Sequence, residues 1–235
     1  VHSVSYGNDE AQNGHDYMNR TNVEFAKMAA LGYSILFASG DQGAWGRSGE
    51  FVFHPDFPGA SPYITTVGAT QFVDSTIGHE VGTAWSGGGF SGIFSPPSYA
   101  EATFKNYFQV ARALPNQGLF NNKGNGYPLL SAHGGAGGNP YCIYQDGRNG
   151  GVEGTSASTP VFAAMVSLIN GQRMAMGKKP IGFLTPLIYH MGQTDPKKYF
   201  HQVTSGENNC CAGQQGQAVC CQYGTKCPLL LLLLL

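Results

Sequence analysis

The chain has 235 residues, a formal net charge of −1 and no cluster of lysine or arginine residues. Hydrophobic residues make up 42% of it and charged residues 11%, which is enough apolar surface for a large core and too little charge for a disordered chain. This composition excludes the basic surface of a nucleic-acid-binding protein and a polybasic membrane patch. We therefore expect one globular domain that has neither nucleic acid nor membrane as a partner.

The start of the chain has the pattern of a strand–helix–strand unit. Residues 2–6 alternate as in a strand, residues 17–31 carry apolar side chains near helical spacing, and residues 34–38 form a short apolar run. The two strands of such a unit are expected to run parallel. The second run ends in Ser-Gly-Asp, so we expect Asp41 just beyond the carboxyl end of a buried strand, where open α/β sheets place their ligands.

The middle of the chain carries weaker signals. Residues 62–68 are rich in β-forming side chains, and a glycine-rich loop at 86–91 follows Trp85. Clusters of glycine usually mark tight turns and backbone that lies close to a ligand. From residue 95 to residue 140 the pattern predicts turns and short elements.

A second helix is predicted after the string Gly-Thr-Ser-Ala-Ser-Thr-Pro at 154–160. Residues 161–170 are hydrophobic or small on almost every face, which predicts a buried helix. Proline is tolerated in the first turn of a helix, so Pro160 is expected there, with Ser156 at the helix N-terminus. Unpaired N–H groups at such an end stabilise negative charge, but an N-cap is the ordinary role of a serine in this place.

Three strings, in their order along the chain, resemble motifs of the sedolisin family of serine-carboxyl peptidases, nearest to its tripeptidyl-peptidase members. Phe-Ala-Ser-Gly-Asp-Gln-Gly-Ala at 37–44 resembles the strand and loop with the oxyanion Asp, and Ser-Gly-Gly-Gly-Phe-Ser at 86–91 resembles a family loop. The string at 154–160 resembles the family's nucleophile motif and, more loosely, that of the subtilisins. The resemblance extends to residues 1–7, 62–70 and 182–189 and ends near Gly206.

The resemblance implies a subtilisin-like α/β fold, a mostly parallel sheet with helices on both faces, of which this chain is a partial domain. Residues 1–206 would form a catalytic domain that lacks its N-terminal part, and residues 207–235 a cysteine-rich tail. The chain begins without Met or a signal-peptide pattern, so we expect its start to be internal to a longer protein. The leucine run at 229–235 is far shorter than the ~20 apolar residues that span a bilayer. We interpret it as a truncation or frame artefact, with a hydrophobic anchor as the alternative.

For function, the resemblance implies a serine-carboxyl mechanism. Ser156 would attack the peptide carbonyl, a Glu would be its general base, and an Asp would orient that Glu. Asp41 would donate a hydrogen bond to the tetrahedral oxyanion, which a carboxylic acid does only while it is protonated. Peptide hydrolysis at acidic pH is therefore expected, with the release of tripeptides from free N-termini as one form of it. A turn-forming or capping role is the alternative for Asp41.

The catalytic set is expected to be incomplete in this chain. The family's Glu and Asp pair lies upstream of the strand that begins the chain, so the chain alone is expected to be inactive. Glu153 precedes the nucleophile string and is interpreted as a solvent-facing loop residue. A pseudo-peptidase or protein-binding domain of the same fold stays open as a second function. An α/β-hydrolase is not favoured, because residues 154–158 lack the closing glycine of a nucleophile elbow.

Substrate binding is predicted at Ser86, Gly87 and Gly88, whose backbone would pair with an extended peptide; a plain mobile loop is the alternative. The substrate would be a peptide or a protein, and the enzyme a monomer.

A calcium site is implied by the family, but this chain departs from it. Gln202, followed by Val203, stands where the family has an Asp, and the later Gly-Trp-Asp-Pro portion is absent. Calcium takes about 6–8 oxygen ligands with carboxylates among them, so too few remain, although a neutral Gln can still ligate. Leu129 likewise replaces the Asp of the family's Tyr-Pro-Asp, which removes one structural carboxylate.

The cysteines indicate an oxidising compartment. Five of the six fall between residues 210 and 227, and the sixth is Cys142. Their crowding predicts disulfides, with a metal knuckle as the minor alternative, and Asn-Arg-Thr at 19–21 is a glycosylation sequon. We expect a secretory route to a lysosomal or other acidic compartment or to the outside of the cell.

Overall fold

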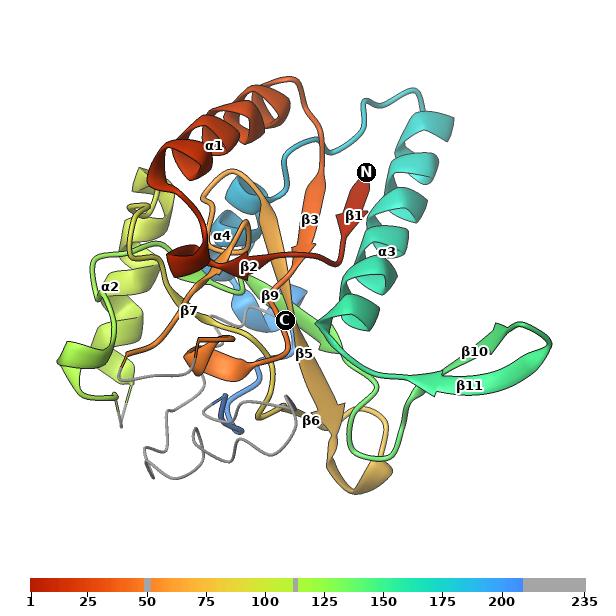
Figure 1. Cartoon of the computed structure of the whole chain (residues 1–235). Coiled ribbons are helices and arrows are strands. Elements are labelled where there is room, and N and C mark those ends of the chain that lie inside the picture. Colours follow the sequence, from red (N-terminus) through yellow and green to blue (C-terminus); the bar gives the residue numbers. More distant parts are fainter. Residues whose placement is uncertain (49–51, 112–113, 209–235) are drawn as a thin grey trace.

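The centre of the molecule is a mostly parallel sheet. The computed structural model describes residues 1–48, 52–111 and 114–208 (Figure 1). In this described part, five strands form one sheet in the order β1, β3, β5, β6, with β9 paired to β5. The parallel strands are β1 (His2–Val4), β3 (Ile35–Ala38), β5 (Thr65–Phe72) and β9 (Leu130–His133). The short strand β6 (Glu80–Gly82) is antiparallel to the end of β5.

Helices cover both faces of this sheet. Figure 1 shows α1 (His15–Ala30) on one side and α3 (Thr155–Ala175) on the other. The predicted strand–helix–strand unit is therefore β1, α1 and β3, and its parallel pairing is confirmed. The remaining helices are α2 (Glu101–Val110), α4 (Thr185–Thr194) and α5 (Pro196–Tyr199).

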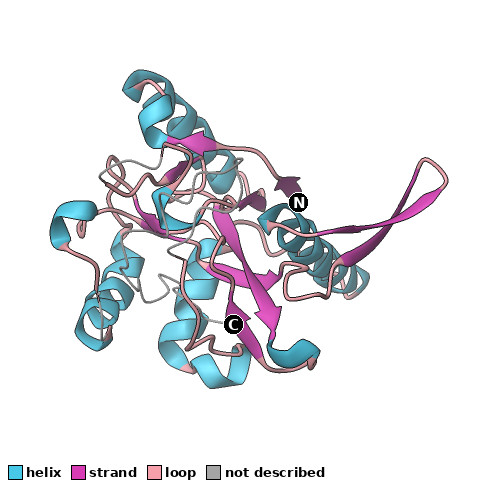
Figure 2. Ribbon diagram, turned by 60° about the horizontal axis from the view of Figure 1, so that its bottom comes forward, coloured by secondary structure: helices cyan, strands magenta, loops and turns pink. Residues whose placement is uncertain are grey.

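Short antiparallel strand pairs lie outside the central sheet. These are β2 (Asn8–Asp9) with β4 (Asp56–Phe57), β7 (Gly89–Phe90) with β8 (Gly126–Tyr127), and β10 (Tyr141–Gln145) with β11 (Arg148–Val152). The hairpin of β10 and β11 projects from the body of the molecule just before α3 begins (Figures 1 and 2).

Alternation along β3 explains why both faces are covered. Leu36 lies in the core cluster formed with residues of α2, α3 and α4, whereas Ile35 and Phe37 lie in a second cluster with residues of α1. Successive side chains of a strand point to opposite faces, so an uninterrupted apolar run needs an apolar partner on each side.

The structure corrects two expectations for the second helix. α3 already begins at Thr155, so Pro160 lies in its second turn and not in the first. The helix is also not buried all round, because a helix that lies against one sheet buries one side. Met165, Leu168 and Ile169 are 50%, 71% and 45% exposed.

Some expectations fall outside the described residues. The tail from residue 209 onward, with five cysteines and the leucine run, is among them, so its disulfides and its domain boundary stay predictions. Cys142 is exposed and forms no disulfide within the described residues. Among the helices that the structure describes, none combines the length and the apolar character needed to cross a membrane.

A buried charged cluster joins the loops that follow β1 and β3. Asp9 is fully buried and accepts hydrogen bonds from the backbone N–H groups of Arg47 and Ser48 and from the Ser48 hydroxyl. The Arg47 guanidinium lies 2.8 Å from a carboxylate oxygen of Asp56, whose backbone N–H donates to the Tyr127 hydroxyl at 2.6 Å. Desolvation by burial outweighs the attraction of Arg47 and raises the pKa of Asp56 to about 7.

The raised pKa of Asp56 predicts a fold that becomes more stable as the pH falls. The pKa is about 7 in the folded protein and ~3.9 in an unfolded chain, so the folded state binds more protons between these values. The free energy of unfolding should rise by up to about 1.4 kcal/mol per pH unit as the pH falls from about 7 toward about 4. Above about pH 7 Asp56 is deprotonated in both states, so it no longer makes the free energy of unfolding depend on pH.

Denaturant unfolding of the wild type and of Asp56→Asn at pH values across this range measures the effect. The Asn variant should lose this part of the pH dependence. Asp146→Asn is the matched control, because Asp146 is exposed in a turn with φ 51°, where Asn fits equally well. The same pH dependence in wild type and Asp56→Asn would contradict the assignment.

Candidate active site

The two residues that the sequence assigned to chemistry come together at the start of α3. Thr155, the residue before Ser156, donates its backbone N–H to Oδ1 of Asp41 at 2.7 Å and its hydroxyl to the same oxygen at 2.8 Å. The Thr155 hydroxyl in turn accepts the Gly40 N–H at 3.2 Å. Thr155 and Asp41 are 114 residues apart in the sequence. The fold thus connects the predicted nucleophile to the predicted oxyanion residue through one intervening side chain.

Ser156 is not the N-cap of its helix. The N-cap is Gly154, and Ser156 lies within the first turn with an exposed side chain. Gly154 has φ 137°, which side-chain-bearing residues rarely adopt, and a Cβ there would lie 3.2 Å from Oδ2 of Asp41. A glycine is therefore required where α3 meets Asp41, and the ordinary capping role does not explain Ser156.

The two carboxyl oxygens of Asp41 are in different situations. Oδ1 accepts both hydrogen bonds from Thr155, so its lone pairs are occupied. A proton on Oδ1 would point at the N–H or O–H group of Thr155, which are themselves donors, and this is unfavourable. When Asp41 is protonated, its proton therefore belongs on Oδ2, and Asp41 can donate a hydrogen bond only through that oxygen.

The first residues of α3 are each bonded to the end of a different strand. Gly154 donates its N–H to the carbonyl oxygen just after β9 at 2.8 Å, and Thr155 donates to Asp41 just after β3. The carbonyl oxygen of Ser156 accepts a hydrogen bond from the Ser5 hydroxyl, just after β1, at 3.3 Å. Figure 1 shows α3 starting beside these strand ends. Ser156, the predicted nucleophile, is thus placed relative to the sheet by three separate contacts.

The predicted substrate loop lies against the loop after β3. Ser86, Gly87 and Gly88 are all buried, and Gly87 donates its N–H to the Gly40 carbonyl oxygen at 2.7 Å. A Cβ at Gly87 would overlap the carbonyl oxygen of the residue before Gly40, so only glycine fits. The Ser86 hydroxyl accepts a backbone N–H from β5 at 3.0 Å. These contacts support the Asp41 loop from within, and pairing of this segment with a substrate stays a prediction.

Asp56 lies beside the same backbone. A Cβ at Gly40 would come 3.5 Å from one Asp56 carboxyl oxygen, and a Cβ at Gly7 would overlap the other. Protonation of Asp56 therefore changes the charge next to the segments that carry Ser5 and Asp41. Glu10, one residue after Asp9, is also buried, and desolvation raises its pKa although it accepts hydrogen bonds from Ser91 and Gly92.

Sequence reasoning did not assign roles to Thr155, Ser5 or Asp56. Thr155 belongs to the string at 154–160, so the motif itself could have pointed to this residue. Ser5 lies within residues 1–7, but its contact with a residue 151 positions away has no local signal, and none marks Asp56 either. Glu153 is exposed in the loop before α3, which agrees with its prediction as a solvent-facing residue.

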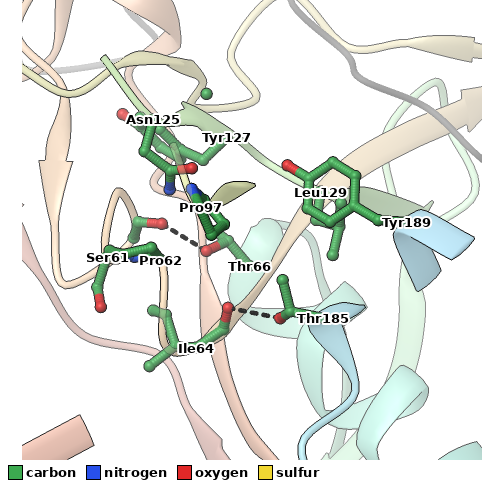
Figure 3. A pocket seen from close by; sticks show the side chains of 12 residues that line it. Ser61, Pro62, Ile64, Thr66, Pro97, Asn125, Tyr127, Leu129, Thr185 and Tyr189 are labelled. Carbon is green, nitrogen blue, oxygen red and sulfur yellow. Dashed lines mark hydrogen bonds between the residues drawn. The ribbon is translucent and has the colours of Figure 1, made fainter. Parts of the chain in front are cut away.

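The pocket shown in Figure 3 is too small to be a substrate site. It holds about 10 Å³, about the space of one water molecule, and Tyr127, Leu129 and Tyr189 are among its lining residues. Leu129 is 4% exposed and belongs to the main core cluster. The leucine that replaces the family's carboxylate is therefore packed as an apolar core residue.

The residues predicted for calcium lie near the end of the described part of the chain. Gln202 is exposed and Val203 is half-buried in the segment that follows α5. Within the described ranges, no group of three or more His, Cys, Asp or Glu side chains could hold a metal ion. Ca²⁺ sites usually include carboxylates beside amide and carbonyl oxygens, and the described residues supply no such cluster, so calcium binding stays a prediction.

Comparison with known proteins finds peptidases among the relatives of this chain. No family model matches the chain. Tripeptidyl-peptidase 1 of Rattus norvegicus and of Homo sapiens are each 40% identical to it over 225 residues, and that of Mus musculus is 41% identical. Each match covers 94% of this chain and 39% of the relative, so the chain spans about two fifths of the length of these relatives.

A solved structure shows the same fold. Pseudomonas sedolisin, a serine-carboxyl proteinase complexed with two molecules of pseudo-iodotyrostatin, matches with a TM-score of 0.66 and 24% sequence identity. The match covers 88% of this chain and 55% of that one, which confirms the subtilisin-like α/β fold as a partial domain. By its sequence match to tripeptidyl-peptidase 1 and by this fold, the chain belongs to the sedolisin family of serine-carboxyl peptidases.

Proposed function

We propose that the protein containing this chain hydrolyses peptide bonds at acidic pH and releases tripeptides from free N-termini. The observation that carries the proposal is the pair of hydrogen bonds between Thr155 and Asp41, which fixes a carboxyl group beside the serine of the nucleophile string. The identity to proteins named tripeptidyl-peptidase 1 supports the release of tripeptides.

Ser156 is the proposed nucleophile. Its Oγ forms a bond to the carbonyl carbon of the substrate, and its proton passes to a carboxylate base, which the family supplies from upstream of this segment. When the C–N bond breaks, that proton goes to the leaving amine, and water then hydrolyses the acyl-serine. The exposed side chain of Ser156 suits attack on a peptide from outside, and the positive end of α3 stabilises the oxyanion beside it.

Asp41 is the proposed oxyanion donor. Thr155 occupies Oδ1, so a proton on Oδ2 can be donated to the oxyanion as the tetrahedral intermediate forms. A deprotonated Asp41 would instead repel the oxyanion, so an acidic medium, which keeps the carboxyl group protonated, favours the reaction. A lysosomal or other acidic compartment of the secretory pathway, or an acidic exterior, provides such a medium.

Ser156→Ala should abolish peptide hydrolysis and leave the fold intact, because the hydroxyl is exposed and supplies the nucleophile. The measurement is tripeptide release from a fluorogenic substrate by the protein expressed from the full reading frame that contains this chain. Ser167→Ala is the matched control, since Ser167 is an exposed serine further along α3 and should retain activity. Undiminished hydrolysis by Ser156→Ala would remove Ser156 from the mechanism.

Asp41→Asn and Asp41→Ala should separate a proton donor from a structural residue. The Asn side chain can accept from Thr155 through its oxygen and donate through its NH₂ at any pH, so activity should persist and its alkaline limit should move upward. The Ala variant should lose roughly 10²–10³ in kcat, as for other lost oxyanion donors. Measuring kcat against pH for the three proteins tests this, and near-wild-type turnover of the Ala variant would exclude Asp41 from catalysis.

Calcium should bind weakly to this chain, because the segment around Gln202 offers neutral oxygens and no carboxylate cluster among the described residues. Titration calorimetry with CaCl₂ on the purified chain measures the affinity. Gln202→Asp restores the family's carboxylate and should strengthen binding relative to the wild type. Micromolar affinity of the wild type would overturn the expectation.

A further inference from the structure

The proline in α3 leaves the carbonyl group of the nucleophile without its helical partner. In an α-helix the N–H of each residue bonds to the carbonyl oxygen four residues earlier, so the partner of the Ser156 carbonyl would be the N–H of residue 160. Residue 160 is a proline in the second turn of the helix and has no N–H. The Ser156 carbonyl must therefore be satisfied from elsewhere.

The neighbouring carbonyl groups are satisfied from within the helix. The Gly154 carbonyl oxygen accepts from the backbone N–H and the hydroxyl of Ser158, both at 3.3 Å. The Thr155 carbonyl oxygen accepts from the Thr159 hydroxyl at 2.8 Å. The Ser156 carbonyl oxygen instead accepts from Ser5, a residue 151 positions earlier.

The backbone on both sides of Ser5 is held in place. Val4 pairs with Phe37 in the central sheet, and Gly7 packs so closely against Asp56 that a Cβ there would overlap the carboxyl group. Ser5 is exposed, so its hydroxyl contributes little to the core. Its position relative to the sheet is nevertheless fixed by these two neighbours.

We propose that Ser5 is a positioning residue for Ser156. Its hydroxyl supplies the hydrogen bond that Pro160 cannot, and so fixes the peptide unit that follows Ser156. That peptide unit sets the backbone of Ser156 and therefore the direction of its Oγ. Without the bond, the carbonyl would tilt toward water, as unpaired carbonyl groups on the solvent side of helices do. The proposal rests on the proposed function of Ser156 as nucleophile.

A double-mutant cycle in the protein expressed from the full reading frame tests this role. Ser5→Ala should lower kcat about 3- to 10-fold and leave KM within about two-fold, which is the effect of one neutral hydrogen bond. Ser5→Thr keeps the hydroxyl and should retain most of the activity. Pro160→Ala restores an N–H at residue 160, so in that background Ser5→Ala should change kcat by less than about two-fold.

Other outcomes overturn the proposal. An equal loss of kcat from Ser5→Ala in both backgrounds would show that Pro160 and Ser5 are not coupled. A raised KM with unchanged kcat would make Ser5 a substrate contact, and failure of Ser5→Thr to retain activity would show that the hydroxyl is not the relevant group.

A second measurement separates this proposal from the proposed function. If the wild type does not hydrolyse peptides, the proposed function fails, but hydrogen exchange still reports on the Ser5 contact. Ser5→Ala should then speed amide exchange in the first turns of α3 when residue 160 is proline, and less when it is alanine. Equal exchange with and without the Ser5 hydroxyl would overturn the positioning role by itself.

Discussion

The contact between Thr155 and Asp41 determines the geometry of the whole site. Two hydrogen bonds, at 2.7 Å and 2.8 Å, join the start of α3 to the end of β3. Ser156 follows Thr155 in the chain, so its distance from Asp41 is set by one covalent step and these two bonds. A displacement of either segment moves Ser156 and Asp41, the proposed nucleophile and oxyanion donor, relative to each other. The proposed reaction needs these two groups placed to within about 1 Å, and the two bonds to one carboxyl oxygen support such placement.

Close backbone packing around this contact explains why glycine gathers there. Gly154 needs a positive φ to begin α3 beside Asp41, and Gly87 has no space for a side chain against the loop that carries Asp41. A larger residue at either place would push the Asp41 loop away from the segment that packs against it. The glycine-rich strings that identified the family in the sequence are thus a steric requirement of this junction.

The sequence predicted the elements that depend on local patterns. The unit of β1, α1 and β3, the position of Asp41 after a buried strand and the position of Ser156 in the first turn of α3 all follow from periodicity and motif. Other elements were not predicted individually. α2 lies in a region predicted as turns and short elements, and the β10–β11 hairpin has an Asp-Gly turn, in which Asp146 and Gly147 both have the positive φ typical of such turns.

Long-range contacts could not be predicted in the same way. The partners Ser5 and Ser156 are 151 residues apart, and neither local sequence indicates their contact. Pro160 was placed in the first turn because a proline costs least there. The structure places it in the second turn, where its missing N–H leaves the Ser156 carbonyl group without a helical partner, and Ser5, just after β1, donates to that group. The preference of proline for the first turn did not predict its position, because the Ser5 hydroxyl, far away in the sequence, replaces the hydrogen bond that is lost in the second turn.

Acidity acts on the chemistry and on the surrounding fold in the same direction. Asp41 donates to an oxyanion only when it is protonated, so the proposed reaction favours low pH. Asp56, which packs against the loops that carry Ser5 and Asp41, has its pKa raised to about 7 by burial, so it becomes neutral as the pH falls. Arg47 then keeps its contact with Asp9, at 3.5 Å, and the desolvation cost of a second buried carboxylate disappears. The contribution of Asp56 to stability therefore favours the fold under the same acidic conditions that the proposed role of Asp41 needs.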